Sequence, residues 1–440
     1  MTTKVTDIQL TPSQERAFQS FKNGANLFLT GKGGSGKSFL VEHIKGWCSS
    51  RGYDVVTCAF MGIAALNVGG STIHRLFKPG NGIISRRNKK CTNPKALEIL
   101  KKVDVFIIDE ISTVRADLFA YVANTILDIW KQQTSDKRKQ IIVVGDFYQL
   151  PPFIIPAEKE AYNAVWENML YAFETPQWKM LHLQTIELQE SMRQTDKGYI
   201  HALDDIREGI PNLSVFRSTA TSDSTAVTLC GRNDEVNNIN TRMLNALPSR
   251  KYRYISTVKG EPQPSDFPTD KELVLAVGAR VIMITNDPDG RWVNGSLATV
   301  TSLGDSYINV RLDDGNTIST GRAEWKIEEY TIEEGKDKKE VKLVKSVKAI
   351  IRQFPVRLAW AISIHKSQGQ TYDRVNVNVK SIFQCGMLYV ALSRCRTLAG
   401  MRIVGDLTAR KVMVDRKVIR FMSERFEAPR QNSIAIPFEE

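Results

Sequence analysis

A glycine-rich octapeptide carries the clearest chemistry in the sequence. It reads Gly31-Lys32-Gly33-Gly34-Ser35-Gly36-Lys37-Ser38 and matches the phosphate-binding pattern G-x-x-x-x-G-K-[ST]. Glycines suit such a loop because backbone amides have to wrap a phosphate at the start of a helix. We expect Lys37 to reach the β- and γ-phosphates of ATP, Gly33 to Gly36 to surround them, and Ser38 to hold Mg²⁺. The competing interpretation is a chance glycine loop, but an apolar run precedes it and a helical pattern follows.

Two adjacent carboxylates follow a second apolar run. Asp109 and Glu110 end the stretch that begins at Val105. Asp109 can ligate Mg²⁺, and Glu110 can activate the attacking water. A helix start with favourable charge is the alternative interpretation of the pair. A GTPase is disfavoured because the guanine-reading pattern Asn-Lys-x-Asp is absent, whereas an ATP-driven switch without hydrolysis remains open.

Two glutamines are candidates for sensing the nucleotide. Gln149 lies in Gly145–Pro152, directly after an apolar run, and can sense the γ-phosphate; the alternative is a tight turn built by glycine and prolines. Gln14 follows Thr11 and Pro12. This spacing fits a helix-capping box and also fits a glutamine that reads adenine, so both roles remain open.

Two arginines further along the chain can act on the same phosphates. Arg193 and Arg394 lie beyond the segment that carries the phosphate loop. An isolated arginine is usually a solvated surface residue. From a second lobe, however, such side chains could stabilise charge that develops on the γ-phosphoryl group.

The elements around these residues predict an α/β protein with two lobes. Alternating apolar runs and helical stretches indicate parallel sheets. For the first lobe the expected strands are Asn26–Thr30, Tyr53–Ala59, Val103–Ile108 and Gln140–Val144. For the second lobe they are His182–Leu188, Val227–Cys230, Val356–Ile364, Arg374–Val379 and Met401–Val404.

Two insertions interrupt these lobes. Residues 252–352 contain short β-rich runs between strong turn signals, which predicts a small antiparallel barrel. Residues 78–93 form a short basic insertion, a candidate strand separator, where Ile83 and Ile84, with Phe77 just before the insertion, could cap a base pair. A mobile basic loop is the alternative interpretation. The expected boundaries are 1–77 and 94–178 for the first lobe, and 179–251 and 353–440 for the second.

The overall charge favours a polyanionic partner. The 440 residues carry a net charge of +12, which attracts nucleic acid through counterion release. Six widely spaced cysteines argue against zinc or disulfides, and no apolar run is long enough for a membrane span. We expect a protein that is not secreted, cytoplasmic or nucleoid-associated in a bacterium and nuclear or mitochondrial in a eukaryote.

Several segments together resemble superfamily-one helicases of the Pif/RecD-like branch. They are Gly31–Ser38, Asp109–Arg115, Gly145–Pro152, Leu188–Gln194, Trp292–Gly295, Ile362–Gln370 and Tyr389–Arg396. The resemblance implies two RecA-like P-loop lobes and a 5′-to-3′ DNA helicase driven by Mg²⁺ and ATP. It also implies adenine reading by Gln14, a place for Gly369 at the ATP site, and arginine-finger roles for Arg193 and Arg394. Work in DNA repair, recombination and telomere maintenance is implied as well.

The same resemblance suggests which residues hold DNA. They are Gly62, Asn67, Thr72 and His74 in the first lobe and Ser363, His365, Lys366 and Ser367 in the second. Two positions depart from the family pattern, because Met61 and Arg232 stand where threonine is usual. For Thr72 and His74, ordinary polarity at a helix start is the alternative. The implied partners are single-stranded DNA and duplex junctions, bound by a monomer. An RNA-directed motor and an ATP-gated strand-binding module remain alternatives.

Overall fold

The computed structural model divides the chain into two compact units. It describes residues 9–60, 62–80, 82–87, 90–132, 139–216, 218–219, 223–334 and 341–427. Unit 1 comprises Met1–Met192, Glu328–Ser346 and Asp415–Glu440, and unit 2 comprises Arg193–Ile327 and Val347–Val414. Each unit contains a parallel sheet, as the sequence predicted.

The sheet of unit 1 has six strands in the order β3-β2-β4-β5-β1-β6. They are β1 (Leu27–Gly31), β2 (Val55–Ala59), β3 (Ser71–Thr72), β4 (Val105–Asp109), β5 (Gln140–Val144) and β6 (Gln184–Leu188). All the pairings are parallel. The central strands β1, β4 and β5 are buried along their whole length, because helices cover both faces of a parallel sheet.

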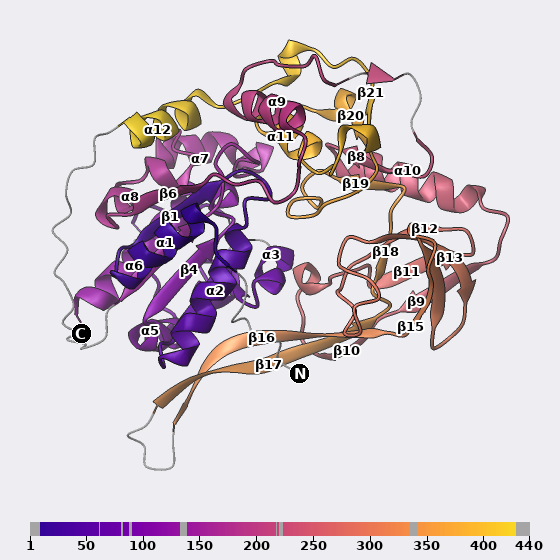
Figure 1. Cartoon of the computed structure of the whole chain (residues 1–440). Helices are drawn as coiled ribbons and strands as arrows, with labels where there is room; N and C mark the ends of the chain where they lie inside the picture. The colour runs from indigo at the N-terminus through magenta and orange to yellow at the C-terminus, as the bar shows by residue number, and fades with distance from the viewer. Residues whose placement is uncertain are drawn as a thin grey trace. The chain divides into compact units, whose positions relative to one another are not determined.

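The helices of unit 1 surround this sheet, as Figure 1 shows for α1, α2, α5 and α6. They are α1 (Pro12–Lys22), α2 (Lys37–Ser50), α3 (Gly62–Asn67), α4 (Ile73–Phe77), α5 (Pro94–Lys102), α6 (Ala116–Lys131), α7 (Lys159–Trp166), α8 (Pro176–Met180) and α12 (Arg416–Glu427). In α12, the ring of Phe421 stacks on Phe173 with centroids 4.2 Å apart. The α12 ring thereby joins the aromatic core that also holds Phe28 and Phe147.

Two expected lobe boundaries are wrong. The strand at Gln184–Leu188 was assigned to the second lobe, but it pairs with β1 in unit 1, with Leu27 opposite Gln184. The carboxyl-terminal segment was also assigned to the second lobe, yet α12 packs into the core of unit 1. Both errors have one cause, since sheet and core membership depend on partners that lie far away in the sequence.

The parallel sheet of unit 2 has the strand order β19-β8-β20-β21-β7. Its strands are β7 (Ser218–Thr219), β8 (Val227–Cys230), β19 (Ala361–Ser363), β20 (Val375–Asn378) and β21 (Met401–Val404). The helices are α9 (Lys197–Glu208), α10 (Asn233–Ala246) and α11 (Met387–Leu392). The single strand expected over Val356–Ile364 is two strands, because β18 (Val356–Leu358) pairs with β12 of the insertion and only β19 joins the parallel sheet.

The insertion in unit 2 is built of antiparallel strands, as predicted. A five-stranded sheet has the order β15-β14-β13-β12-β18, and sheets of three strands (β10-β17-β16) and two strands (β11-β9) accompany it. The strands are β9 (Lys251–Ile255), β10 (Thr257–Gly260), β11 (Glu272–Ala276), β12 (Arg280–Met283), β13 (Leu297–Leu303), β14 (Ile308–Leu312), β15 (Thr317–Thr320), β16 (Ala323–Glu334) and β17 (Val341–Gln353). Their shared core includes Val281, Val300 and Phe354.

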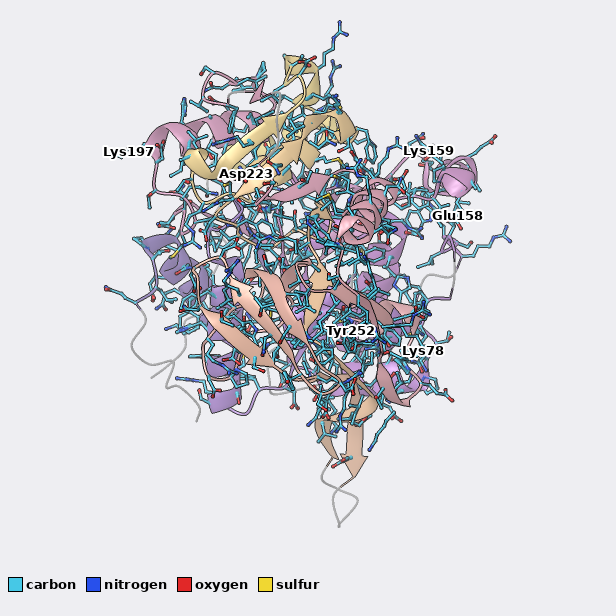
Figure 2. All side chains as sticks on the ribbon, turned by 90° about the vertical axis from the view of Figure 1, so that its right-hand side faces the viewer. Lys78, Glu158, Lys159, Lys197, Asp223 and Tyr252 are labelled. Carbon is cyan, nitrogen blue, oxygen red and sulfur yellow. The ribbon has the colours of Figure 1, made fainter. Side chains whose placement is uncertain are left out.

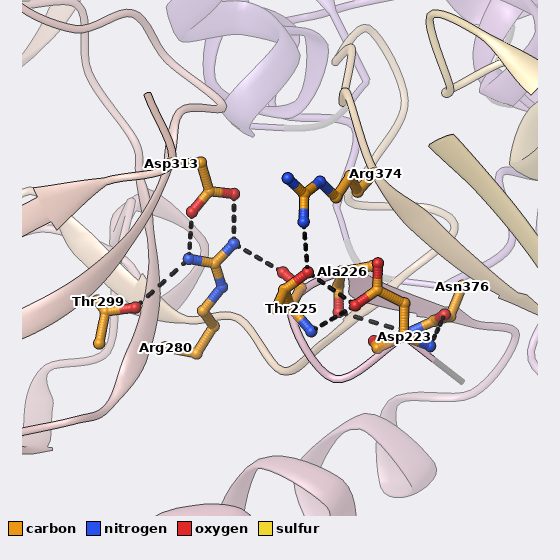
Figure 3. A network of polar contacts seen from close by, with 8 residues as sticks. All are labelled: Asp223, Thr225, Ala226, Arg280, Thr299, Asp313, Arg374 and Asn376. Atoms are coloured by element: carbon orange, nitrogen blue, oxygen red, sulfur yellow. Dashed lines mark hydrogen bonds and ion pairs between the residues drawn. The ribbon is translucent and has the colours of Figure 1, made fainter. Parts of the chain in front are cut away.

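An arginine joins this insertion to the α/β part of unit 2. Arg280 on β12 forms a two-pronged ion pair with Asp313 and donates a hydrogen bond to the carbonyl of Thr225 at 2.8 Å. Figure 3 shows the network continuing from Thr225 to Arg374 and from Asp223 to Asn376. Bidentate arginine–carboxylate pairs fix geometry, so the network holds the five-stranded sheet against the loop before β8.

The far end of the long β16–β17 hairpin belongs to unit 1 rather than to the insertion. Tyr330 accepts a hydrogen bond from the backbone N–H of Thr57 at 3.2 Å, and Lys345 donates to the carbonyl of Gly69. The expected domain at 252–352 is therefore wrong at this end of the hairpin, where Tyr330 contacts β2 and Lys345 contacts the turn before β3.

The short insertion packs against α6 and α7. The N–H of Ile84 donates to Asp117 at 3.0 Å, and the carbonyl of Ile84 accepts from the Trp166 indole at 2.8 Å. Figure 2 marks Lys78, where the segment begins. Ile84 is 7% exposed and Phe77 is fully buried. The expectation that these two side chains cap a base pair is wrong, because both are committed to the core.

All six cysteines are free thiols in the structure, and five of them are buried. Among the described residues, no helix combines the length and apolar character needed to cross a membrane.

Candidate active site

The phosphate loop connects the end of β1 to the start of α2. Gly34 and Gly36 have φ values of 87° and 81°, a left-handed conformation that glycine adopts without a Cβ clash. A Cβ on Gly31 would lie 2.6 Å from the carbonyl oxygen of Leu188 on the neighbouring strand. The glycines are therefore required both by backbone conformation and by close packing against β6.

Lys37 is folded back over this loop. Its ammonium group donates to the carbonyls of Gly31 at 2.6 Å and Lys32 at 2.9 Å, and lies 3.5 Å from the Ser35 hydroxyl. Ser38 follows in the first turn of α2 and is exposed. The loop thus concentrates a cation, a hydroxyl and a helix amino terminus, which is the arrangement that anions such as phosphate prefer.

The acidic pair lies at the carboxyl end of β4. Strand order places β4 and β1 on either side of β5, so the ends of all three strands meet at one edge of the sheet. Asp109 is 8% exposed and accepts a hydrogen bond from the Glu110 N–H at 2.8 Å. Burial raises the pKa of Asp109, while this hydrogen bond and the charge of Lys37 oppose the shift.

Glu110 has an unusual backbone conformation. Its φ of 51° lies in the left-handed region, which costs a residue with a side chain on the order of 1 kcal/mol. The next residues form a short 3₁₀ turn, Ile111–Thr113, that approaches Gly145 at the end of β5. Strain of this kind is often retained at functional sites, because it aims a side chain that the regular strand would direct elsewhere.

Gln149 and Gln14 both lie close to this edge of unit 1. Gln149 is 7% exposed, and its side-chain amide lies 3.5 Å from Asp146. Gln14 completes the capping box of α1, since its Oε1 accepts from the Thr11 N–H at 3.0 Å. Its Nε2 also approaches the carbonyl of Gly36 at 3.4 Å. The capping role is confirmed, and the side chain lies beside the phosphate loop.

The residues present fit Mg²⁺. Ser38 and Asp109 offer one hydroxyl and one carboxylate, and Asp109 senses the charge of Lys37 on the phosphate loop. Within the described ranges, no group of three or more acidic, histidine or cysteine side chains forms a dedicated metal cage. Mg²⁺ bound with nucleotide needs no such cage, because phosphate and water oxygens supply most of its ligands.

Arg193 and Arg394 cluster in unit 2. Arg193 donates to the carbonyl of Ser393 at 3.0 Å. Burial and the neighbouring charge of Arg394 lower the pKa of Arg193 to about 9. Arg394 is 1% exposed and donates to the carbonyl of Val390 at 2.9 Å and to the Ser393 hydroxyl at 2.8 Å. Two like charges held in a low dielectric make this cluster attractive to an anion.

The second-unit strand-binding candidates surround the loop after β19. Ser363 and Ser367 are buried, and the hydroxyl of Ser367 donates to the carbonyl of Ile364 at 2.8 Å. His365 is half-buried, and burial lowers its pKa. Lys366 is exposed, although partial burial and then the charge of Arg357 lower its pKa.

A pocket of about 210 Å³ opens beside these residues. Ser363, Lys366 and Arg357 line it together with Asn237 and Asn240. The buried Ser363 Oγ has no hydrogen-bond partner among the described residues. The pocket therefore presents two cations and the buried Ser363 hydroxyl, together with the carboxylate of Asp270, which also lines it.

The first-unit candidates lie on two short helices. Gly62 begins α3 and Asn67 ends it. Thr72 is the N-cap of α4 and accepts from the Arg75 N–H at 3.1 Å, so the helix-start interpretation is confirmed for this residue. His74 is exposed, and desolvation together with Arg115 lowers its pKa. Met61 lies outside the described residues.

The sequence matches a known protein family. Residues 9–214 match the family of PIF1-like helicases. The ATP-dependent DNA helicase Pif1 of Campylobacter jejuni is 30% identical over 436 residues, covering 90% of this chain and 94% of the relative. The chain belongs to the PIF1-like helicase family.

Solved structures place the resemblance in three dimensions. The crystal structure of Bacteroides sp Pif1 in complex with ADP-AlF4 has a TM-score of 0.83 and 32% identity, covering 95% of this chain and 97% of that one. Bacteroides Pif1 bound to ssDNA matches with a TM-score of 0.66, 32% identity and the same coverage. The fold of this PIF1-like helicase is thus found in relatives that bind a nucleotide analogue and a DNA strand.

In this PIF1-like helicase, two further residues at these sites could not be predicted from sequence motifs alone. Glu190 accepts hydrogen bonds from Thr11 and Ser13, which lie nearly the whole first lobe away in sequence. Arg357 lines the pocket beside Lys366 from a strand of the insertion. For Glu190, the only available signal was its position inside the segment Leu188–Gln194.

Of the two residues that depart from the family pattern, Arg232 lies within the described part of the chain. Arg232 precedes α10 as its N-cap residue, and its guanidinium lies 5.1 Å from the ring centroid of Phe383. The threonine usual at this place could donate a hydroxyl proton, whereas the arginine supplies a cation over an aromatic ring. Asn233, the next residue, begins the helix.

Proposed function

We propose that this chain, an ATP-dependent DNA helicase, translocates 5′-to-3′ along single-stranded DNA and unwinds duplex or structured DNA. The carrying observation is the phosphate loop on β1 facing the Asp109–Glu110 pair on β4, within a fold shared with Pif1 helicases. The direction of movement is proposed from family resemblance.

Hydrolysis is assigned to residues of unit 1. Lys37 leaves its carbonyl partners to hold the β- and γ-phosphates, and the amides of Gly33, Gly34, Ser35 and Gly36 surround them. Glu110 accepts a proton from the attacking water, and Gln149 contacts the γ-phosphate. When bound with ATP at Ser38 and Asp109, Mg²⁺ neutralises charge on the phosphates.

The two arginines are proposed to stabilise the transition state. The guanidinium of Arg193 donates to the backbone carbonyl of Ser393 in a partly buried cluster, and a transferring phosphoryl group would be a charged and therefore stronger acceptor. Arg394 is enclosed by its own unit, and acting on phosphate would require it to leave Val390 and Ser393. Gly369, exposed in the turn after Ser367, is proposed to approach the nucleotide by its backbone.

Strand binding is proposed to use phosphate contacts rather than base reading. Lys366, Arg357 and the hydroxyl of Ser363 line one pocket in unit 2. In unit 1, Thr72 and His74 lie at the start of α4. Cations and hydroxyls position a strand without reading its sequence. We propose that the chain works as a monomer on single-stranded DNA and duplex junctions; the ssDNA complex of Bacteroides Pif1 supports the choice of partner.

The deciding assay compares ATP turnover with no strand, with a DNA oligonucleotide and with an RNA oligonucleotide of the same sequence. A DNA-directed motor requires strong stimulation by DNA and weak stimulation by RNA. Equal turnover in all three conditions would instead favour an ATP-gated binding module. Stronger stimulation by RNA would favour an RNA-directed motor.

A further inference from the structure

Glu190 lies between the turn Thr11–Gln14 and the phosphate loop. We call Thr11–Gln14 the base-reading turn, because the family resemblance implies that Gln14 reads adenine. It follows β6, whose register sets Leu188 opposite Gly31 at the start of the phosphate loop. Its Oε1 accepts from the Ser13 N–H at 3.3 Å, and its Oε2 accepts from the Thr11 hydroxyl at 3.1 Å and from the Ser13 hydroxyl. One carboxylate therefore gathers three donors from the turn that begins α1.

Counting protons fixes the direction of each bond in this turn. An ionised carboxylate has no proton, so the hydroxyls of Thr11 and Ser13 both have to donate to it. The Thr11 oxygen is then left to accept from the Gln14 N–H at 3.3 Å. Although burial acts to raise it, the hydrogen bonds from Ser13 and Thr11 leave the pKa of Glu190 below its ordinary value, in keeping with the ionised form.

The hydrogen bonds of Gln14 likewise fix the orientation of its side-chain amide. Its Oε1 accepts from the Thr11 N–H at 3.0 Å, which leaves Nε2 to face the carbonyl of Gly36 at 3.4 Å. An amide with a fixed oxygen and nitrogen offers one acceptor next to one donor. Adenine presents the complementary donor at N6 and acceptor at N7, whereas guanine presents acceptors at both O6 and N7.

Residues after Glu190 extend the connection to the phosphates. The N–H of Met192 donates to the carbonyl of Gly34 in the phosphate loop at 2.9 Å. Arg193 is the next residue in the chain. A strap of three residues, Glu190–Met192, thus touches the base-reading turn at one end and the phosphate loop at the other.

We propose that Glu190 is a positioning residue that sets the selectivity for ATP over GTP by fixing the amide of Gln14. The proposal rests on the ATPase function proposed above and on adenine reading by Gln14. It assigns Glu190 no direct contact with the nucleotide. Its effect passes through Thr11 and Ser13, so it should appear in base selectivity more than in the chemical step.

The test compares kcat/KM for ATP and GTP at saturating DNA. We expect Glu190→Ala to reduce the ATP-over-GTP ratio by about five- to tenfold, because a reoriented amide no longer rejects guanine. Glu190→Gln should retain most of the ratio, since an amide can accept from the Ser13 N–H and donate to the hydroxyls. Glu15→Ala is the matched control, an exposed carboxylate on the same helix.

Variants of Gln14 and Ser13 provide an independent test. Gln14→Ala should lower the ratio on its own, and adding Glu190→Ala should lower it no further, because both act through one amide. The far-ultraviolet circular dichroism spectrum shows whether Glu190→Ala is folded. If it is not, Ser13→Ala takes its place: it removes the hydroxyl that donates to Glu190 and should also lower the ATP-over-GTP ratio.

Three outcomes would overturn the proposal while leaving the helicase function intact. They are an unchanged ratio in folded Glu190→Ala and Ser13→Ala proteins, an equal loss of kcat/KM for both nucleotides, and an unmodified protein that does not distinguish ATP from GTP. Absence of DNA-stimulated turnover in the unmodified protein would instead contradict the proposed function itself.

Discussion

Single residues at the nucleotide site are held by partners that a nucleotide would have to replace. Lys37 donates to two carbonyls of its own loop, and Asp109 accepts from the N–H of Glu110. Binding phosphate exchanges these neutral acceptors of Lys37 for anionic ones, which adds the attraction between opposite charges to each hydrogen bond. The identities of these residues were predictable because the loop and the acidic pair are local strings. The pairing of Glu190 with Thr11 was not, because no local pattern records a contact between distant turns.

Replacing Lys37 should affect ATP binding, whereas replacing Glu110 should affect ATP turnover. Lys37→Ala should abolish productive ATP binding, because the phosphates lose their cation. Glu110→Gln should retain ATP binding and lower DNA-stimulated turnover by on the order of a hundredfold or more, because the amide cannot accept the proton. Nucleotide affinity by fluorescence and turnover by phosphate release measure the two effects. Glu160→Gln on the exposed face of α7 is the control, and near-normal turnover in Glu110→Gln would contradict the assignment.

The two arginines should differ in stability as well as in catalysis. Arg193→Ala should lower kcat far more than it raises KM, because a finger acts mainly in the transition state. Arg394→Ala should in addition lower the melting temperature, since it leaves buried carbonyls without their charged donor. Steady-state kinetics and thermal unfolding of both variants provide the comparison. An Arg193→Ala protein that loses ATP affinity at an unchanged maximal rate would remove Arg193 from this role.

Elements that depend on local pattern were predicted closely, and those that depend on distant pairing were not. The strands at Val227–Cys230 and Met401–Val404 match their predicted bounds because short apolar runs define them. The strand β6 was found but assigned to the wrong lobe, since its partner β1 is chosen by pairing rather than by composition.

The short insertion should behave as a packed element. Ile84 is buried between α6 and α7, and its backbone bonds to Asp117 and Trp166. Ile84→Ala should lower the free energy of unfolding by about 2–4 kcal/mol, as for other buried isoleucines that are truncated. The exposed Arg87 in the same segment is the control, and Arg87→Ala should change stability by less than about 0.5 kcal/mol. Equal denaturant midpoints for the two variants would mean that the segment is not packed as described.

At the scale of the whole molecule, charge indicates how a strand is held. The net charge of +12 attracts a polyanion, and Lys366 with Arg357 concentrates two cations in one pocket. The polyanionic partner and the family were both predictable from sequence. The cation from the insertion was not, because Arg357 joins the pocket only through the pairing of β18 with β12.

Strand affinity should fall with salt, and Lys366 should account for part of the slope. A plot of the logarithm of the binding constant against the logarithm of salt concentration falls with a slope of about 0.7 for each neutralised phosphate. Lys366→Ala should reduce that slope by about the same amount, equally for oligonucleotides of different mixed sequences. Lys197→Ala is the control, an exposed lysine at the start of α9 in the same unit (Figure 2). Strong sequence preference that persists at high salt would contradict a grip through phosphates.

We expect the protein to act as an ATP-driven motor that enters a DNA junction from a 5′ single strand. The most direct measurement is strand displacement on three otherwise identical duplexes, which carry a 5′ tail, a 3′ tail or no tail, each with and without ATP and Mg²⁺. Glu110→Gln serves as the turnover-deficient comparison. We expect displacement of the 5′-tailed duplex alone, only with ATP, and loss of this displacement in Glu110→Gln. Displacement that prefers the 3′ tail, or that proceeds equally without ATP, would contradict this expectation.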